Sequence, residues 1–296
     1  MNYLEKYGYN PDEQKIADAV EAIASNLDNL SSPEVLKSCF SIMDLTTLNS
    51  KDTDASVLKL VDKVNKLPEA FPEYPAPASI CVYPNFASTV KNGLTVPGVH
   101  VTTVSSCFPS AQSFLEVKVR ECELAVQNGA DEIDIVLALN AFLAGDEARA
   151  LEEIVTMKNA IDKAAAAQGR DVVLKVILET GLLVSPANIA EASFLAMEAG
   201  ADFIKTSTGK VDVNATPVAA VVMCEAIRRF YEVSGRKVGF KAAGGISTAK
   251  DALGYYSIVN TILGQEWLNR KLFRFGVSRL GNSLVSAIEQ KTVTYF

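Results

Sequence analysis

Short apolar runs alternate with longer segments of helical periodicity along most of the chain. Eight runs of four to seven residues have the length and composition of buried strands, namely 41–45, 79–83, 99–104, 132–137, 172–178, 203–206, 238–241 and 273–277. Between them, apolar side chains recur every three or four residues, as at Leu151, Ile154, Met157 and Ile161. Strands that alternate with helices form right-handed βαβ units and a parallel sheet.

Turn and cap residues support this assignment. Ser185–Pro186 and Thr216–Pro217 have the composition of helix N-caps, and Gly129, Gly200 and Gly235 stand where helices should end. Eight βα units favour an α/β protein with a closed (β/α)8 TIM barrel. An open doubly wound sheet is less favoured, because no G-x-G-x-x-G follows the early strands.

The chain divides into three parts around this barrel. Residues 1–38 are polar with helical spacing and predict an N-terminal helical extension, and 39–285 form a single barrel domain. Residues 286–296 form a C-terminal tail. Two roles remain open for this tail, a mobile segment that reaches the active site and an inert end.

Composition narrows the class of protein. The chain has 296 residues, 49% apolar and 21% charged, as in soluble globular proteins. A net charge of −7 with scattered basic residues argues against nucleic acid, and no apolar run is long enough to span a membrane or serve as a secretory signal. Five cysteines without a CxxC pair suit a reducing compartment, so we expect a cytoplasmic protein.

His100 is the only histidine. A single histidine excludes an HExxH motif and a three-histidine zinc site, and it permits a Ser-His-Asp triad only if His100 is the base. We therefore expect no metal.

Charged and thiol side chains interrupt the apolar strands. They are Asp44, Cys81, Asp134, Lys175, Lys205 and Lys241. Because buried charges are rarely left unpaired, we expect these groups to face one another inside the barrel. A structural ion network would explain one or two of them, whereas the full set favours an active site at the carboxyl ends of the strands.

Lys205 is the candidate nucleophile. An ordinary lysine amine has a pKa near 10.4, so about one in 2500 is neutral at pH 7. Burial and a second ammonium would lower that pKa and allow attack on a carbonyl, and Lys241 could supply the second charge. Asp134 could then shuttle protons. The alternative is a lysine whose stem lies in the core while its amine reaches water.

The loops after the seventh and eighth strands predict a phosphate site. Gly244 and Gly245 let backbone N–H groups turn toward an anion, and Gly276 and Ser278 offer a second donor cluster. These loops are the customary phosphate site of the barrel fold.

Eight motifs in order resemble the deoxyribose-phosphate aldolases, a family of metal-free, Schiff-base (class I) aldolases. They are DLTTLN (44–49), ICVYP (80–84), DEIDIV (131–136), LKVILETG (174–181), FIKTSTGK (203–210), VNAT (213–216), GFKAAGG (239–245) and FRFGVS (273–278). The chain departs from the family at Ala242, where proline is usual, at 107–111, which lacks two glycines, and at Arg279, where a small hydroxyl residue is usual.

The resemblance implies reversible cleavage of 2-deoxy-D-ribose 5-phosphate to acetaldehyde and D-glyceraldehyde 3-phosphate, with no cofactor. It implies that Lys205 forms the imine, Lys241 lowers its pKa, Asp134 relays protons and Asp44 holds the network around Lys241. Tyr295 corresponds to a tyrosine that assists proton transfer. The implied phosphate contacts are Thr208, Lys210, Gly244, Gly245, Gly276 and Ser278, and Arg279 could join them.

Two other functions stay open. One is a Schiff-base aldolase or transaldolase that acts on a different sugar phosphate, and the other is a non-catalytic barrel that keeps the ions as structure. The expected partners are small molecules, with a homodimer as one candidate assembly.

Overall fold

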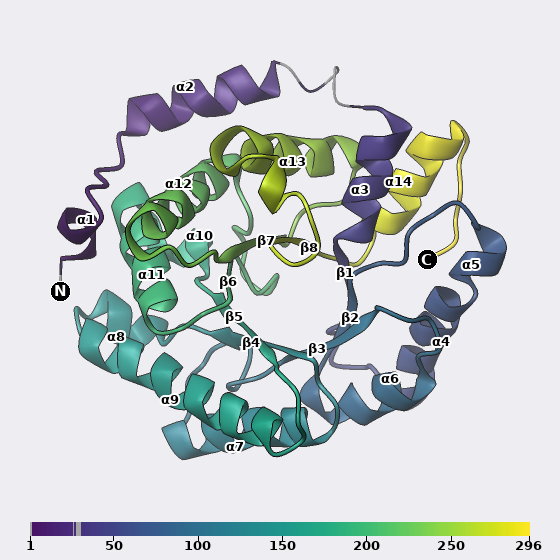
Figure 1. Ribbon diagram of the computed structural model, residues 1–296, viewed down its shortest axis with the longest axis horizontal. Coiled ribbons are helices and arrows are strands. Elements are labelled where there is room, and N and C mark those ends of the chain that lie inside the picture. Colours follow the sequence, from purple (N-terminus) through teal and green to yellow (C-terminus); the bar gives the residue numbers. More distant parts are fainter. Residues whose placement is uncertain (1, 26, 28–30) are drawn as a thin grey trace.

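The barrel is closed and its eight strands are parallel (Figure 1). The computed structural model describes residues 2–25, 27 and 31–296. The strands are β1 (Met43–Thr46), β2 (Ser79–Val82), β3 (His100–Val104), β4 (Glu132–Val136), β5 (Val173–Ile177), β6 (Phe203–Lys205), β7 (Gly239–Ala243) and β8 (Phe273–Val277). They follow one another in chain order around the barrel, and β8 pairs with β1. The predicted (β/α)8 fold is confirmed, with strand ends within two residues of the predicted runs.

Helices surround the strands. They are α4 (Asp54–Asn65), α5 (Leu67–Ala70), η2 (Pro84–Phe86), α6 (Ala87–Gly93), α7 (Leu115–Gln127), α8 (Leu139–Leu143), α9 (Glu147–Ala166), α10 (Thr180–Leu183), α11 (Pro186–Glu198), α12 (Pro217–Ser234), α13 (Ala249–Leu263), η3 (Gln265–Trp267) and α14 (Leu280–Glu289). The hydroxyls of Ser185 and Thr216 accept backbone N–H bonds at the starts of α11 and α12, as predicted. Gly235 ends α12 with a positive φ of 68°. Across the described part of the chain, no helix is both long enough and apolar enough to cross a membrane.

The N-terminal extension wraps the outside of this ring (Figure 1). Its first helix, α1 (Tyr3–Lys6), packs on α11, and the Tyr7 ring stacks on Phe194 at 4.4 Å between centroids. The second helix, α2 (Glu13–Ala24), contacts α12 and α13. The third, α3 (Pro33–Ser41), lies against α13 and α14 and leads into β1. The extension therefore covers the outer surface of the second half of the barrel.

Side chains inside the barrel differ in character from those between strands and helices. Successive side chains of a strand point to opposite faces of the sheet. In β4, the buried Ile133 and Ile135 belong to the apolar core, whereas Glu132 and Asp134 meet charged groups from other strands. The alternation places apolar packing outside the barrel wall and an ion network within it.

Candidate active site

Seven charged side chains fill the interior of the barrel, and we call them the ion network. They are the carboxylates of Asp44, Glu132 and Asp134 and the cations of Lys175, Lys205, Lys241 and Arg274. Each side chain is at most 4% exposed. Because they come from β1 and β4–β8, only closure of the barrel brings them together.

Asp134 lies at the centre of the upper part of the network. The Nζ atoms of Lys205 and Lys241 each donate to its Oδ2 at 2.8 Å, and Nζ of Lys175 donates to its Oδ1 at 2.9 Å. Lys205 and Lys241 are paired neighbours in the register of β6 and β7. The strand register therefore holds two amines on one carboxylate oxygen.

Glu132 and Arg274 form the lower part of the network, and neither was predicted as a site residue. Arg274 Nη2 donates to Glu132 Oε1 at 2.6 Å, and its Nη1 donates to Asp44 Oδ1 at 2.6 Å. The other oxygen of Asp44, Oδ2, lies 2.5 Å from Lys241 Nζ. The two-residue period of a strand could have identified Glu132, because it lies two positions before Asp134 and shares its face.

The two paired lysines have opposite pKa shifts. Burial lowers the pKa of Lys205; Asp134 opposes this, and the ammonium of Lys241 lowers the pKa further, so the net direction is down. Burial alone would also lower the pKa of Lys241. The two carboxylates of Asp134 and Asp44 outweigh it, and the pKa of Lys241 is raised. Lys241 therefore stays an ammonium while Lys205 gives up its proton more easily.

The carboxylates of the network are held ionised. Burial would raise the pKa of Asp134, but the surrounding Lys175, Lys205 and Lys241 lower it. The pKa values of Asp44 and Glu132 are lowered in the same way, chiefly by lysine and arginine charges that overcome burial. Cys81 is buried beside these groups, and burial raises the pKa of its thiol. Cys81 is thus a neutral neighbour of the network.

A cavity of about 300 Å³ opens above Lys205. Eight predicted residues line it, namely Lys205, Thr208, Lys210, Gly244, Gly245, Gly276, Ser278 and Arg279. Thr46, the last residue of β1, and Asn49, from the loop after it, also line the cavity and were not predicted. Of the seven network side chains, Lys205 alone reaches the cavity wall.

Glycine is required where the loops approach the network. Gly244 and Gly245 follow each other at the end of β7 with φ values of 84° and 82°, a backbone that L side chains rarely adopt. A turn backbone can direct successive N–H groups toward an anion. At Gly276, a Cβ would lie 2.8 Å from the Cβ of Ala243 and 3.1 Å from Cε of Lys241. Any side chain there would push on Lys241.

Thr208 is held by the buried carboxylate of Glu179, which was not predicted as a site residue. Glu179 Oε1 accepts from the backbone N–H of Thr208 at 3.1 Å, and its Oε2 accepts from the Thr208 hydroxyl at 2.5 Å. That hydroxyl accepts from the N–H of Lys210 at 3.0 Å, and Lys210 Nζ donates to the carbonyl of Leu48 at 2.5 Å. These contacts fix the loop 206–210 over Lys205.

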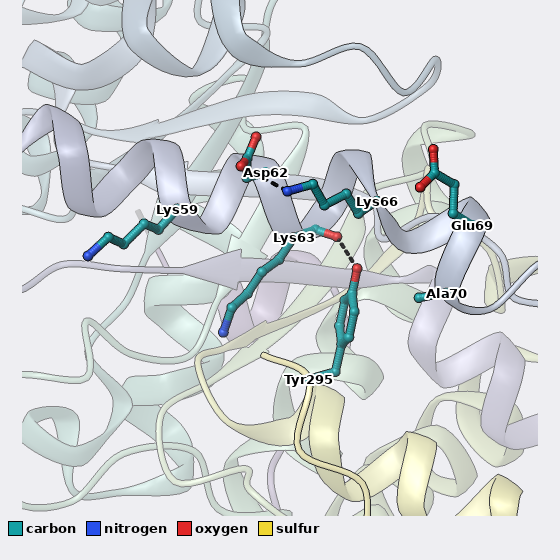
Figure 2. A pocket seen from close by; sticks show the side chains of 7 residues that line it. All are labelled: Lys59, Asp62, Lys63, Lys66, Glu69, Ala70 and Tyr295. Carbon is teal, nitrogen blue, oxygen red and sulfur yellow. Dashed lines mark hydrogen bonds and ion pairs between the residues drawn. The ribbon is translucent and has the colours of Figure 1, made fainter.

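The structure corrects the expected position of Tyr295. Its hydroxyl donates to the backbone carbonyl of Lys63 in α4 at 2.7 Å, and its ring packs edge-on against Phe71 at 5.3 Å (Figure 2). The side-chain Oδ1 of Asn282 accepts its backbone N–H at 2.8 Å. Tyr295 therefore lies against α4 and Phe71 in the helix layer, because the tail finds apolar and hydrogen-bonding partners there, and it does not line the cavity above Lys205.

A buried amine beside a second ammonium, at the mouth of a (β/α)8 barrel with glycine loops, defines an imine-forming barrel enzyme. Comparison with known proteins specifies the family. The sequence model of the DeoC/LacD family aldolases matches residues 39–257 of this chain. A Caenorhabditis elegans protein described provisionally as a deoxyribose-phosphate aldolase is 42% identical over 276 residues, which are 92% of this chain and 88% of the relative. The chain belongs to the DeoC/LacD aldolase family, which confirms the resemblance found in the sequence.

Solved structures share the fold. A Toxoplasma gondii ME49 protein, also described provisionally as a deoxyribose-phosphate aldolase, superposes with a TM-score of 0.73 at 24% identity over 87% of this chain and 98% of that chain. The deoxyribose phosphate aldolase of Aeropyrum pernix, described as a unique tetramer, gives a TM-score of 0.64 at 24% identity over 95% and 98% of the two chains. At these identities the two structures show the common fold alone.

Proposed function

We propose that this protein catalyses the reversible cleavage of 2-deoxy-D-ribose 5-phosphate to acetaldehyde and D-glyceraldehyde 3-phosphate through an imine on Lys205. One observation carries the proposal. Lys205 is the single network side chain that reaches the cavity, and its pKa is lowered although its amine contacts Asp134. Family membership and the name of the C. elegans relative support the choice of 2-deoxy-D-ribose 5-phosphate as the substrate.

In the synthetic direction, the neutral amine of Lys205 adds to the carbonyl carbon of acetaldehyde. Loss of water forms the protonated imine, and loss of a proton from its methyl carbon gives the neutral enamine. The enamine carbon then forms a bond to the aldehyde carbon of glyceraldehyde 3-phosphate, whose oxygen takes up a proton as the protonated imine forms again. Water hydrolyses the new imine, which releases the sugar phosphate and restores the amine.

The network would assist each proton transfer. Asp134, 2.8 Å from both Lys205 and Lys241, is placed to relay protons with a water molecule. Lys241 keeps its charge and lowers the pKa of Lys205, and Asp44 fixes Lys241 from below. Lys175 holds the second oxygen of Asp134, and Cys81 adds a neutral wall beside it.

The far end of the cavity would bind the phosphate. Gly244 and Gly245 supply a turn backbone, and Gly276 in β8 and Ser278 just after it line the cavity beside them. Thr208 and Lys210 close the cavity from the β6 loop, and the exposed Arg279 adds a positive charge at the rim. A homodimer and a cytoplasmic location remain predictions.

Trapping with acetaldehyde and borohydride tests the imine. We expect reduction to leave an ethyl group on Lys205, located by peptide mapping, and no label in Lys205→Met. Label on another lysine, or none, would refute the mechanism and favour the non-catalytic barrel. Turnover of 2-deoxyribose 5-phosphate beside other sugar phosphates then separates this function from that of an aldolase or transaldolase with another substrate.

A further inference from the structure

Arg274 occupies the base of the ion network and is remote from the chemistry. Its guanidinium donates to both Asp44 and Glu132 at 2.6 Å, and its Nε donates to the backbone carbonyl of Arg270. The guanidinium carbon also lies 5.8 Å from the centre of the Phe203 ring. Its side chain is 3% exposed and does not line the cavity. Any effect of Arg274 on Lys205 must therefore pass through the network.

The count of charges in the network suggests such an effect. Three carboxylates face four cationic side chains. Arginine stays charged at every accessible pH, and Lys241 is bound by two carboxylates. Arg274, Lys175 and Lys241 together balance the three carboxylates. A proton on Lys205 would then give the network one positive charge in excess, in a medium that penalises it.

We propose that Arg274 is a positioning residue for the reaction, because its fixed charge, added to those of Lys175 and Lys241, balances the three carboxylates and so leaves Lys205 as the free amine. The inference rests on the proposed function, in which Lys205 is the nucleophile. The charged end of Arg274 acts here as a permanent substitute for the proton that Lys205 would otherwise carry.

The titratable groups around Lys205 and Arg274 are consistent with this count of charges. Lys205 faces Asp134, Lys241 and the neutral thiol of Cys81. Below the network, His100 Nδ1 lies 2.7 Å from Glu132 Oε1, and 46% of the His100 side chain is exposed. His100 is present in the wild type and in the Arg274 variants alike, so it does not change the sign of the shift expected between them.

The rate of borohydride trapping with acetaldehyde, measured against pH, tests the proposal. For Arg274→Met we expect the pH of half-maximal rate to rise by at least one unit, with about a tenfold lower rate at pH 7, because the network becomes neutral with Lys205 protonated. Glu132→Gln should lower the pH of half-maximal rate instead. The double variant removes one charge of each sign and should return to within about half a unit of the wild type.

Two further variants separate charge from packing. Arg274→Lys keeps the positive charge and should keep the wild-type profile. Arg270→Met removes a half-buried cation that bonds the carbonyls of Gly98 and Ala76 outside the network, and should also leave the profile unchanged. If Arg274→Met does not fold, as judged by circular dichroism, the pH profiles of Glu132→Gln and of the double variant decide whether the inference holds.

Three results would overturn the inference. The first is a wild-type pH profile in folded Arg274→Met, and the second is a shift in Arg274→Lys equal to that of the methionine variant. The third is a lowered pH of half-maximal rate that persists in the double variant. Failure of the proposed function is distinct, because wild-type protein would then form no adduct on Lys205 at any pH.

Discussion

The two ends of the cavity are built from different parts of the chain. At the amine end, side chains from six strands meet in a network in which each side chain is at most 4% exposed. At the other end, where we propose that phosphate binds, the walls are glycine backbone and exposed side chains such as Ser278 and Arg279. Residue identity therefore matters most at the amine end, because each buried charge there has a specific partner. Backbone shape matters most at the phosphate end.

This contrast predicts how substitutions divide between turnover and binding. Changes in the network should lower kcat, because they alter the protonation of Lys205 and its partners. Changes in the phosphate loops should raise KM for phosphorylated substrates. The following substitutions test that division, beginning with the largest expected effect.

Asp134→Asn should have the largest effect. The amide removes the negative charge shared by Lys205 and Lys241 and cannot accept a proton from the imine intermediates. We expect kcat for 2-deoxyribose 5-phosphate to fall by about 10²–10⁴-fold. Asp171→Asn, at an exposed position, is the control and should retain wild-type turnover. A loss of less than tenfold in kcat for Asp134→Asn would remove Asp134 from the proton relay.

Gly276→Ala should disturb both ends, because the new methyl would collide with Ala243 and press on Lys241. We expect a loss of about 1–3 kcal/mol in the free energy of unfolding, measured by urea denaturation, together with a raised KM. Gly254→Ala is the matched control, because Gly254 lies within α13 with nothing within 4 Å of its added Cβ. That variant should be stabilised by roughly 0.5–1 kcal/mol. Equal effects of the two substitutions would contradict the close packing at Gly276.

Arg279→Ser should affect binding alone. The exposed guanidinium at the rim is expected to contribute about 1 kcal/mol to phosphate binding at low salt, so KM for glyceraldehyde 3-phosphate should rise about fivefold. The rise should shrink as ionic strength increases. Unphosphorylated glyceraldehyde provides the control, and an equal rise in its KM would show that Arg279 does not contact phosphate.

Tyr295→Phe should have the smallest effect on catalysis, because the Tyr295 hydroxyl is bonded to Lys63 on the outside of the barrel. Loss of that hydrogen bond should reduce the free energy of unfolding by about 0.5–1.5 kcal/mol, with kcat changed less than about twofold. A tenfold drop in kcat at unchanged stability would show that the tail enters the site during turnover.

Local sequence signals were enough to predict the fold and most of the cavity. The strand positions, the helix caps at Ser185 and Thr216 and the glycine loops depend on residues a few positions apart. Lys205 and Lys241 could be selected because a cation in an apolar strand requires an explanation. The loop after β3 shows the limit of such signals. Cys107 and Ala111, where the family has glycines, still adopt positive φ values of 55° and 53°.

The pairing of charges was decided only by the tertiary structure. Arg274 and Asp44 are 230 residues apart and meet because β8 closes onto β1. Glu179, after β5, holds Thr208, after β6, because those two strands are paired neighbours. Tyr295 lies on α4 rather than over Lys205 because of packing on the outer helices. The sequence specifies which face of its strand a residue occupies, since that period is local. Barrel closure and register determine which residue it meets, and hence which lysine loses its proton most easily.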